Sequence, residues 1–149
     1  MLVGSTQEGI GIMDVKAYLR NVRKLSLEIK SKRRQRESLY YLCTGSAIRY
    51  DVPNVQTSAD NRLEKILADV ADLDKAIAEN LRELSQKQYK AVEIINSVTK
   101  PEYIAILTDY YMNANTWEKT ADLNGYSVQH TKRMHGYALN ELKDKYETK

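Results

Sequence analysis

Two long stretches of this chain repeat apolar residues at helical spacing, and this repeat constrains the fold more than any other feature of the sequence. In the first stretch, which starts after Asp14, the repeat consists of Val15, Tyr18, Leu19, Val22, Leu25, Ile29 and Leu39. In the second, from about Asp60 to Asn96, it consists of Leu63, Ile66, Leu67, Val70, Leu73, Ile77, Leu81, Leu84, Ala91, Ile94 and Ile95. Residues three, four and seven apart share one face of an α-helix, so each stretch predicts a helix with an apolar stripe.

Composition and turn residues extend this prediction to the whole chain. Only 6 Gly and 2 Pro occur among 149 residues, and Phe is absent. Short strands need frequent turn residues between them, so we expect an all-α protein. Gly45, Pro53 and Asn54 interrupt the helical pattern and predict an exposed loop of about residues 43–59.

Both predicted helices have end signals. Asp14 is a suitable N-cap for the first helix, which we expect to end near Leu42, and Asn61 with Glu64 can form a capping box for the second. Helices of roughly thirty residues are about 45 Å long, longer than a small domain is wide. We therefore expect residues 14–96 to form a coiled-coil hairpin that assembles the chain into a homo-oligomer, with a dimer favoured.

Other features exclude several classes of protein. Residues 1–13 lack the basic start of a signal peptide, and we expect them to form a flexible N-terminus. No stretch has the length and apolarity of a membrane span, so no membrane partner is predicted. The single cysteine, Cys43, cannot form an internal disulfide, which favours the cytoplasm. The net charge of +3 is too small to indicate a nucleic-acid partner by itself.

A basic run in the first predicted helix has two interpretations. The run consists of Lys30, Lys32, Arg33, Arg34 and Arg36. Clustered cations can neutralise the phosphates of a nucleic acid. If the two helices fold back on each other, the same cations can instead pair with the acidic residues Glu64, Asp69, Asp72 and Asp74. The geometry of a hairpin favours the second interpretation.

The remaining residues, 97–149, predict a separate C-terminal module. Pro101 suits the first position of a helix, whose apolar residues are Tyr103, Ile106, Leu107, Tyr110 and Tyr111. Thr116 and Ser127 are suitable N-caps for two further helices, and Gly125 between them can adopt a positive φ. Two helices joined by such a turn form a helix-turn-helix, whose second helix enters the major groove of DNA.

The last predicted helix, Val128 to about Leu142, suits DNA readout. Its predicted buried stripe is Thr131, Met134, Ala138 and Leu142. The candidate DNA-binding residues are Ser127, Gln129, His130, Lys132, Arg133, Gly136 and Asn140. Gln can bind adenine and Arg guanine with two hydrogen bonds each, while Lys and Ser can bind phosphates. Gly136 is costly in a helix interior, and its bare backbone would let a DNA strand approach.

This module resembles region 4 of bacterial RNA polymerase sigma factors, with the matching residues Trp117, Glu118, Ala121, Gly125, Ser127, Ala138 and Leu139. Over more of its length, including Val55–Ser58, the chain resembles a family of small phage proteins from Gram-positive hosts, similar in plan to phage late-gene transcriptional regulators. These resemblances imply DNA contact by Ser127, Gln129, His130, Lys132 and Arg133, a bacterial host cytoplasm, and host RNA polymerase as a further partner. The sigma pattern has a large aliphatic residue where this chain has Asn124, so we expect different packing under the turn.

The sequence therefore predicts a sequence-specific double-stranded DNA-binding protein that regulates transcription in a phage or prophage. One alternative is a small terminase-like subunit of DNA packaging, and another is a module that binds host RNA polymerase without reading bases. We expect neither catalysis nor a cofactor, because no nucleophile motif or phosphate-binding loop is present. No metal site is predicted, since His130 and His135 lie about 140° apart around their helix.

Overall fold

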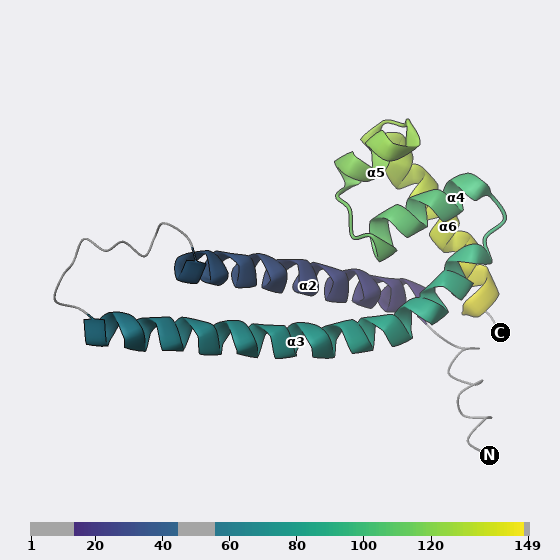
Figure 1. Ribbon diagram of the computed structural model, residues 1–149. Coiled ribbons are helices and arrows are strands. Elements are labelled where there is room, and N and C mark those ends of the chain that lie inside the picture. Colours follow the sequence, from purple (N-terminus) through teal and green to yellow (C-terminus); the bar gives the residue numbers. More distant parts are fainter. Residues whose placement is uncertain (1–13, 45–55, 148–149) are drawn as a thin grey trace, which may run out of the picture. The chain divides into compact units, whose positions relative to one another are not determined.

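The computed structural model describes residues 14–44 and 56–147, which form helices and connecting turns without any strand. In chain order, the elements are α2 (Val15–Thr44), α3 (Gln56–Asn96), α4 (Pro101–Leu107), the π-helical segment η1 (Thr108–Met112), α5 (Trp117–Asn124) and α6 (Val128–Tyr146) (Figure 1). The predicted all-α class is confirmed for this part of the chain. The predicted flexible N-terminus and residues 45–55 of the predicted loop lie outside the described residues. None of the described helices is both long enough and apolar enough to cross a membrane.

α2 starts as predicted and ends slightly later. The backbone N–H of Ala17 donates a 3.0 Å hydrogen bond to Oδ1 of Asp14, which caps the helix. α2 continues to Thr44, whose hydroxyl donates to the carbonyl of Tyr40 at 3.0 Å. Cys43 is therefore helical, although the sequence predicts it in the loop.

The start of α3 differs more from the prediction. α3 begins at Gln56 and ends at Asn96, so Asn61 and Glu64 lie inside the helix. The predicted capping box is wrong. Pro53 is the last residue in this region that excludes regular helical geometry, and the helix extends back almost to it.

The described residues divide into two compact units at places that the sequence did not indicate. Unit 1 contains residues 14–26 and 84–147, and unit 2 contains residues 27–44 and 56–83. The sequence predicts a boundary near residue 97 instead. Ile94 and Ile95, which are adjacent in α3, are both 1% exposed. Adjacent residues point about 100° apart on a helix, so burying both requires packing on two sides of α3.

Unit 1 has an extensive core. Its buried apolar residues include Val15, Leu19, Val22, Ala91, Ile94, Ile95, Val98, Ile106, Leu107, Tyr111, Ala138 and Leu142. Where α2 and α3 pack in this unit, the Tyr18 hydroxyl donates to the carbonyl of Lys87 at 3.1 Å, and the Lys87 ammonium donates to Oδ1 of Asn21. Pro101 begins α4 as predicted.

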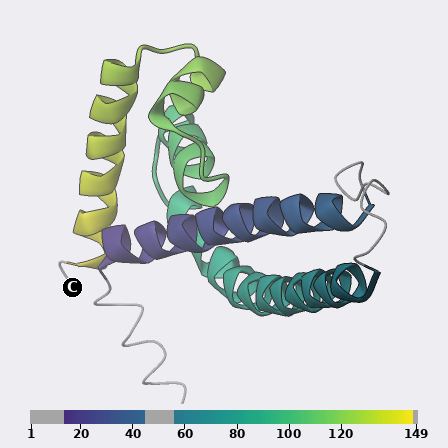
Figure 2. The same cartoon turned by 90° about the vertical axis from the view of Figure 1, so that its left-hand side faces the viewer.

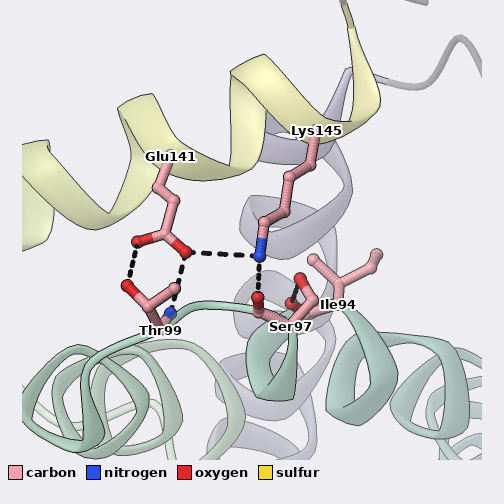
Figure 3. A network of polar contacts seen from close by, with 5 residues as sticks. All are labelled: Ile94, Ser97, Thr99, Glu141 and Lys145. Carbon is pink, nitrogen blue, oxygen red and sulfur yellow. Dashed lines mark hydrogen bonds and ion pairs between the residues drawn. The ribbon is translucent and has the colours of Figure 1, made fainter.

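The far end of α6 is fixed to the connection between α3 and α4 (Figure 3). The Glu141 carboxylate accepts hydrogen bonds from the N–H of Thr99 at 2.8 Å and from its hydroxyl at 3.0 Å. Lys145 donates to the carbonyl of Ser97 and lies 3.3 Å from the Glu141 carboxylate. Burial acts to raise the pKa of Glu141, but the hydrogen bonds from Thr99 and the contact with Lys145 outweigh it and leave the pKa below its ordinary value.

Unit 2 consists of residues 27–44 of α2 and 56–83 of α3, which lie side by side and run in opposite directions (Figures 1 and 2). An ion pair joins Arg36 to Asp74, as the hairpin interpretation of the basic run predicts. Asp69 instead lies 3.3 Å from Lys65 on its own helix.

The core of unit 2 is small. Among its described residues, three apolar side chains are buried, those of Ile29, Val70 and Ile77. Asn80 lies on the same seam, and its amide nitrogen is buried without a hydrogen-bond partner in the described part of the chain. An unpaired buried amide destabilises the folded state.

Candidate nucleic-acid interface

A short turn of three residues, 125–127, joins the end of α5 to the start of α6 (Figure 2). Thr116 and Ser127 cap the two helices as predicted, accepting hydrogen bonds from the N–H groups of Lys119 and His130, each at 3.1 Å. Gly125 has a φ of 71° after the last turn of α5. Glycine adopts this left-handed conformation without the strain that a Cβ atom adds.

One side of α6 is buried, and it carries the predicted stripe of Thr131, Met134, Ala138 and Leu142. The Thr131 hydroxyl donates to the carbonyl of Ser127 at 2.8 Å, which satisfies this buried polar group. Thr120 and Ala121, on the neighbouring helix α5, are also buried. The packing therefore fixes which side of α6 faces outward.

The outward side carries the predicted DNA-binding residues. The exposed ones are Ser127, Gln129, His130, Lys132, Arg133 and Asn140. Gly136 is half-buried, and a Cβ atom added there would meet no atom within 4 Å, so its backbone adjoins open space.

These side chains differ in how they are held. The His130 ring packs edge-on against Tyr126 with 5.1 Å between centroids, and the Lys132 ammonium lies 5.9 Å over the ring of Trp117. Within the described residues, the side chains of Gln129, Arg133 and Asn140 make neither hydrogen bonds nor ion pairs. Their donors and acceptors are therefore available to a ligand.

An aromatic cluster lies behind the outward side of α6. The rings of Tyr110 and Trp117 stack with 3.9 Å between centroids and an interplanar angle of 18°. His135 packs edge-on against Trp117 at 4.8 Å, and its Nε2 atom lies 2.6 Å from the Tyr111 hydroxyl. The cluster joins η1, α5 and α6 through ring contacts that hold α6 in place.

Burial sets the protonation of the Tyr111 and His135 pair. Burial, aided by the positive charges of Lys16 and Arg20, lowers the pKa of His135 to about 4. Burial likewise raises the pKa of the Tyr111 phenol. At neutral pH, both rings are therefore uncharged and share one hydrogen bond, so His135 adds no positive charge to the outward side.

Arg23 of α2 holds the segment that precedes α5. Its guanidinium lies 3.9 Å from the centroid of the Tyr110 ring and donates to the carbonyls of Tyr110 at 2.6 Å and Asn115 at 2.7 Å. Carbonyls at the end of a helix lack partners within it, and a cation is favourable there. Sequence reasoning missed Arg23 because its partners lie about ninety residues further along the chain.

η1 corrects the prediction of a regular helix through Tyr111. The N–H of Asn113 donates to the carbonyl of Thr108, five residues earlier, at 3.0 Å. The wider π-helical turn brings Tyr110 and Tyr111 to the cluster together. A regular spacing of apolar residues does not distinguish this turn from an α-helix, and no other signal in the sequence indicates it.

Asn124 explains the departure from the sigma-like pattern. Its amide nitrogen donates to Oδ2 of Asp109 at 3.0 Å and to the carbonyl of Thr120 at 2.8 Å. The adjacent Leu123 is 54% exposed and does not take the aliphatic position. A polar link between α5 and η1 therefore replaces apolar packing under the turn.

No protein-family model, curated protein or solved structure matches this chain. The resemblance to sigma region 4 accordingly stays a prediction that depends on the residues quoted for it. The described part of the chain contains no cluster of three or more His, Cys, Asp or Glu side chains that could hold a metal ion.

Proposed function

We propose that this protein binds double-stranded DNA in a sequence-specific manner, with α6 in the major groove. The observation that carries the proposal is the exposed row of Gln129, Arg133 and Asn140 on a helix whose other side is buried. These side chain types form two-point hydrogen bonds with the edges of adenine and guanine. None of the three is occupied by a hydrogen bond or ion pair within the described residues.

The residues around this row can supply phosphate contacts. Ser127 lies at the start of α6, where the helix dipole and free N–H groups favour an anion. Lys132 and His130 are exposed beside the row and are restrained by ring contacts, which reduces the entropy lost on binding. The open space beside Gly136 leaves room for a DNA strand.

The same proposal includes regulation of transcription in a phage or prophage, since the resemblance to sigma region 4 implies contact with host RNA polymerase as well. A dimer would present two copies of α6 to half-sites on one duplex. A terminase-like packaging subunit and a polymerase-binding module without base readout are the alternatives that experiments must separate.

Substitutions on α6 test base readout directly. Arg133→Ala is expected to cost about 1–3 kcal/mol at the specific site and to relax the preference at one base pair. Lys132→Ala is expected to weaken all duplexes similarly and to reduce the salt dependence by about one phosphate contact. Lys143→Ala, exposed near the end of α6, is the matched control.

Binding is measured by fluorescence anisotropy against duplexes that differ at single base pairs. Equal and sequence-independent losses for Arg133→Ala and Lys132→Ala would remove the readout role of Arg133. Absence of salt-sensitive duplex binding by the unsubstituted protein would favour the polymerase-binding alternative.

A further inference from the structure

Unit 2 leaves a second seam exposed on α3. This outer seam consists of Leu67, Ala71, Asp74, Ala78 and Leu81. These residues are separated alternately by four and three positions, as in a coiled coil. All five are exposed, with Leu67 at 48% and Leu81 at 39%. Two of its residues, Ala71 and Ala78, directly follow Val70 and Ile77 of the buried seam. Consecutive residues are rotated by about 100° around an α-helix, so the outer seam lies beside the buried one.

α2 contributes a stripe to the same side of unit 2. Arg36 is paired with Asp74, and its guanidinium lies 5.5 Å over the ring of Tyr40, which places Tyr40 and Asp74 on one side. The stripe of α2 on that side is Lys30, Arg33, Glu37 and Tyr40. Tyr40 is 46% exposed. The opposite side of unit 2 carries a groove lined by Ser31, Arg34, Gln35, Ser38, Leu39 and Leu73.

The charges on this face are complementary to those of the same face in a second molecule. The α2 stripe is basic in its first half, at Lys30 and Arg33, and carries Glu37 further along, whereas the outer seam of α3 is acidic at its centre, at Asp74. Placing α2 on α2 would oppose like charges. Placing α2 on α3 of the second copy, antiparallel as within one chain, brings Arg33 to Asp74 and Tyr40 to Leu67.

We infer that this face binds the same face of a second copy of the chain, forming a four-helix bundle in which α2 of each copy lies on α3 of the other. In this arrangement, a two-fold axis runs parallel to the helices, and all four helices keep the level at which they pair within one chain. The second copy covers Leu67, Leu81 and Tyr40, which unit 2 alone leaves in water. The inference concerns assembly, and its test uses no DNA, so it can fail independently of the proposed function.

Sedimentation equilibrium of the full chain tests the face. We expect a dimer for the unsubstituted protein and a dissociation constant at least tenfold higher for Leu67→Lys and for Leu81→Lys. The matched control is Leu27→Lys, because Leu27 is 42% exposed in the same unit but lies outside the outer seam and the α2 stripe. A monomeric unsubstituted protein, or an equal loss for Leu27→Lys, would overturn the inference.

Charge reversal tests the pairing of α2 with α3. Arg33→Glu and Asp74→Arg should each weaken the homodimer by placing like charges together. Mixing the two variants should restore a heterodimer, because each of its two interfaces again joins opposite charges. Asp74→Arg also loses its contact with Arg36, but that loss is common to the homodimer and the mixture. Circular dichroism checks that both variants stay helical, and failure of the mixture to form heterodimers would contradict this pairing.

Discussion

The two units contain similar apolar repeats but bury them to very different extents. In unit 1, Leu19, Ile106, Leu107 and Leu142 are 0% exposed, whereas the most buried apolar residue described in unit 2, Ile29, is 3% exposed and few others approach it. Apolar burial contributes about 25 cal/mol per Å² removed from water, so unit 1 has the larger stabilising core. The spacing of apolar residues therefore fixes which side of a helix is apolar, while the number of neighbouring helices determines how much of that side is buried.

Truncating a leucine in each unit is expected to give the largest difference in stability between the units. Leu107→Ala in unit 1 is expected to lower the free energy of unfolding by about 2–5 kcal/mol, because it leaves a cavity in a packed core. Leu27→Ala in unit 2, where the side chain is 42% exposed, should cost under about 1 kcal/mol. Urea unfolding of both variants measures the difference, and similar losses would contradict the contrast between the units.

Removing the contacts of Arg23 that attach η1 to α2 is expected to cause the next largest loss of stability. Arg23→Ala removes two hydrogen bonds to backbone carbonyls and the contact with the Tyr110 ring, and we expect a loss of about 2–3 kcal/mol. Lys24→Ala, at the adjacent exposed position, is the control. Trp117 is the single tryptophan and stacks on Tyr110, so its fluorescence reports this region directly. An Arg23→Ala protein as stable as the control would show that these contacts contribute nothing.

His135 predicts a smaller, pH-dependent effect confined to unit 1. Its pKa is about 4 in the folded protein and 6.5 ordinarily, so between these values the unfolded chain binds a proton that the folded chain does not. The free energy of unfolding should therefore fall as the pH decreases from about 6.5 to about 4. We expect a decrease of about 1–2 kcal/mol, reduced from the full shift because the ring is partly exposed.

The comparison that isolates this effect is between imidazoles on the two sides of α6. His135→Gln should make the decrease smaller, with Glu141 still contributing at the acidic end of the range, while His130→Gln, on the outward side, should retain the full decrease. Thermal unfolding at a series of pH values measures both variants. A pH dependence that is the same in the unsubstituted protein and in His135→Gln would exclude His135 as its source.

Gly136→Ala is expected to cause the smallest change in stability, and it tests the outward side of α6. The added Cβ meets no atom within 4 Å, so helix stability should rise by up to about 1 kcal/mol. DNA affinity should fall if a strand approaches this backbone. Gly125→Ala is the contrasting variant, because a φ of 71° makes any Cβ there destabilising. A stabilised Gly136→Ala protein with unchanged DNA affinity would remove Gly136 from the proposed interface.

Local signals predicted much of the helical framework. Pro101, the caps at Asp14, Thr116 and Ser127, and the positive φ of Gly125 each depend on neighbouring backbone atoms, so the residue type is informative. The start of α3 was mispredicted because Asn61 and Glu64, which suit a capping box, can also lie inside a helix. The division into two units could not be read from the stripes, since the same spacing suits one helical partner or several.

The candidate site was predictable as a face but not in its supports. The period of α6 placed Gln129 and Arg133 opposite the buried stripe, and the structure agrees on which side of the helix is exposed. The stacking of Tyr110 on Trp117, the hydrogen bond between Tyr111 and His135, and the carbonyl contacts of Arg23 depend on a π-helical turn and on distant segments. Periodicity carries no information about such contacts.

The most direct test of the proposed function is selection of duplex fragments from the source genome by the purified full-length protein. At about 150 mM salt, non-specific phosphate binding is already weakened, so enrichment reports base readout. We predict enrichment of a repeated half-site beside a promoter, lost in Arg133→Ala. Enrichment at a packaging origin would support the terminase-like alternative instead, and no enrichment of any duplex would contradict DNA recognition by α6.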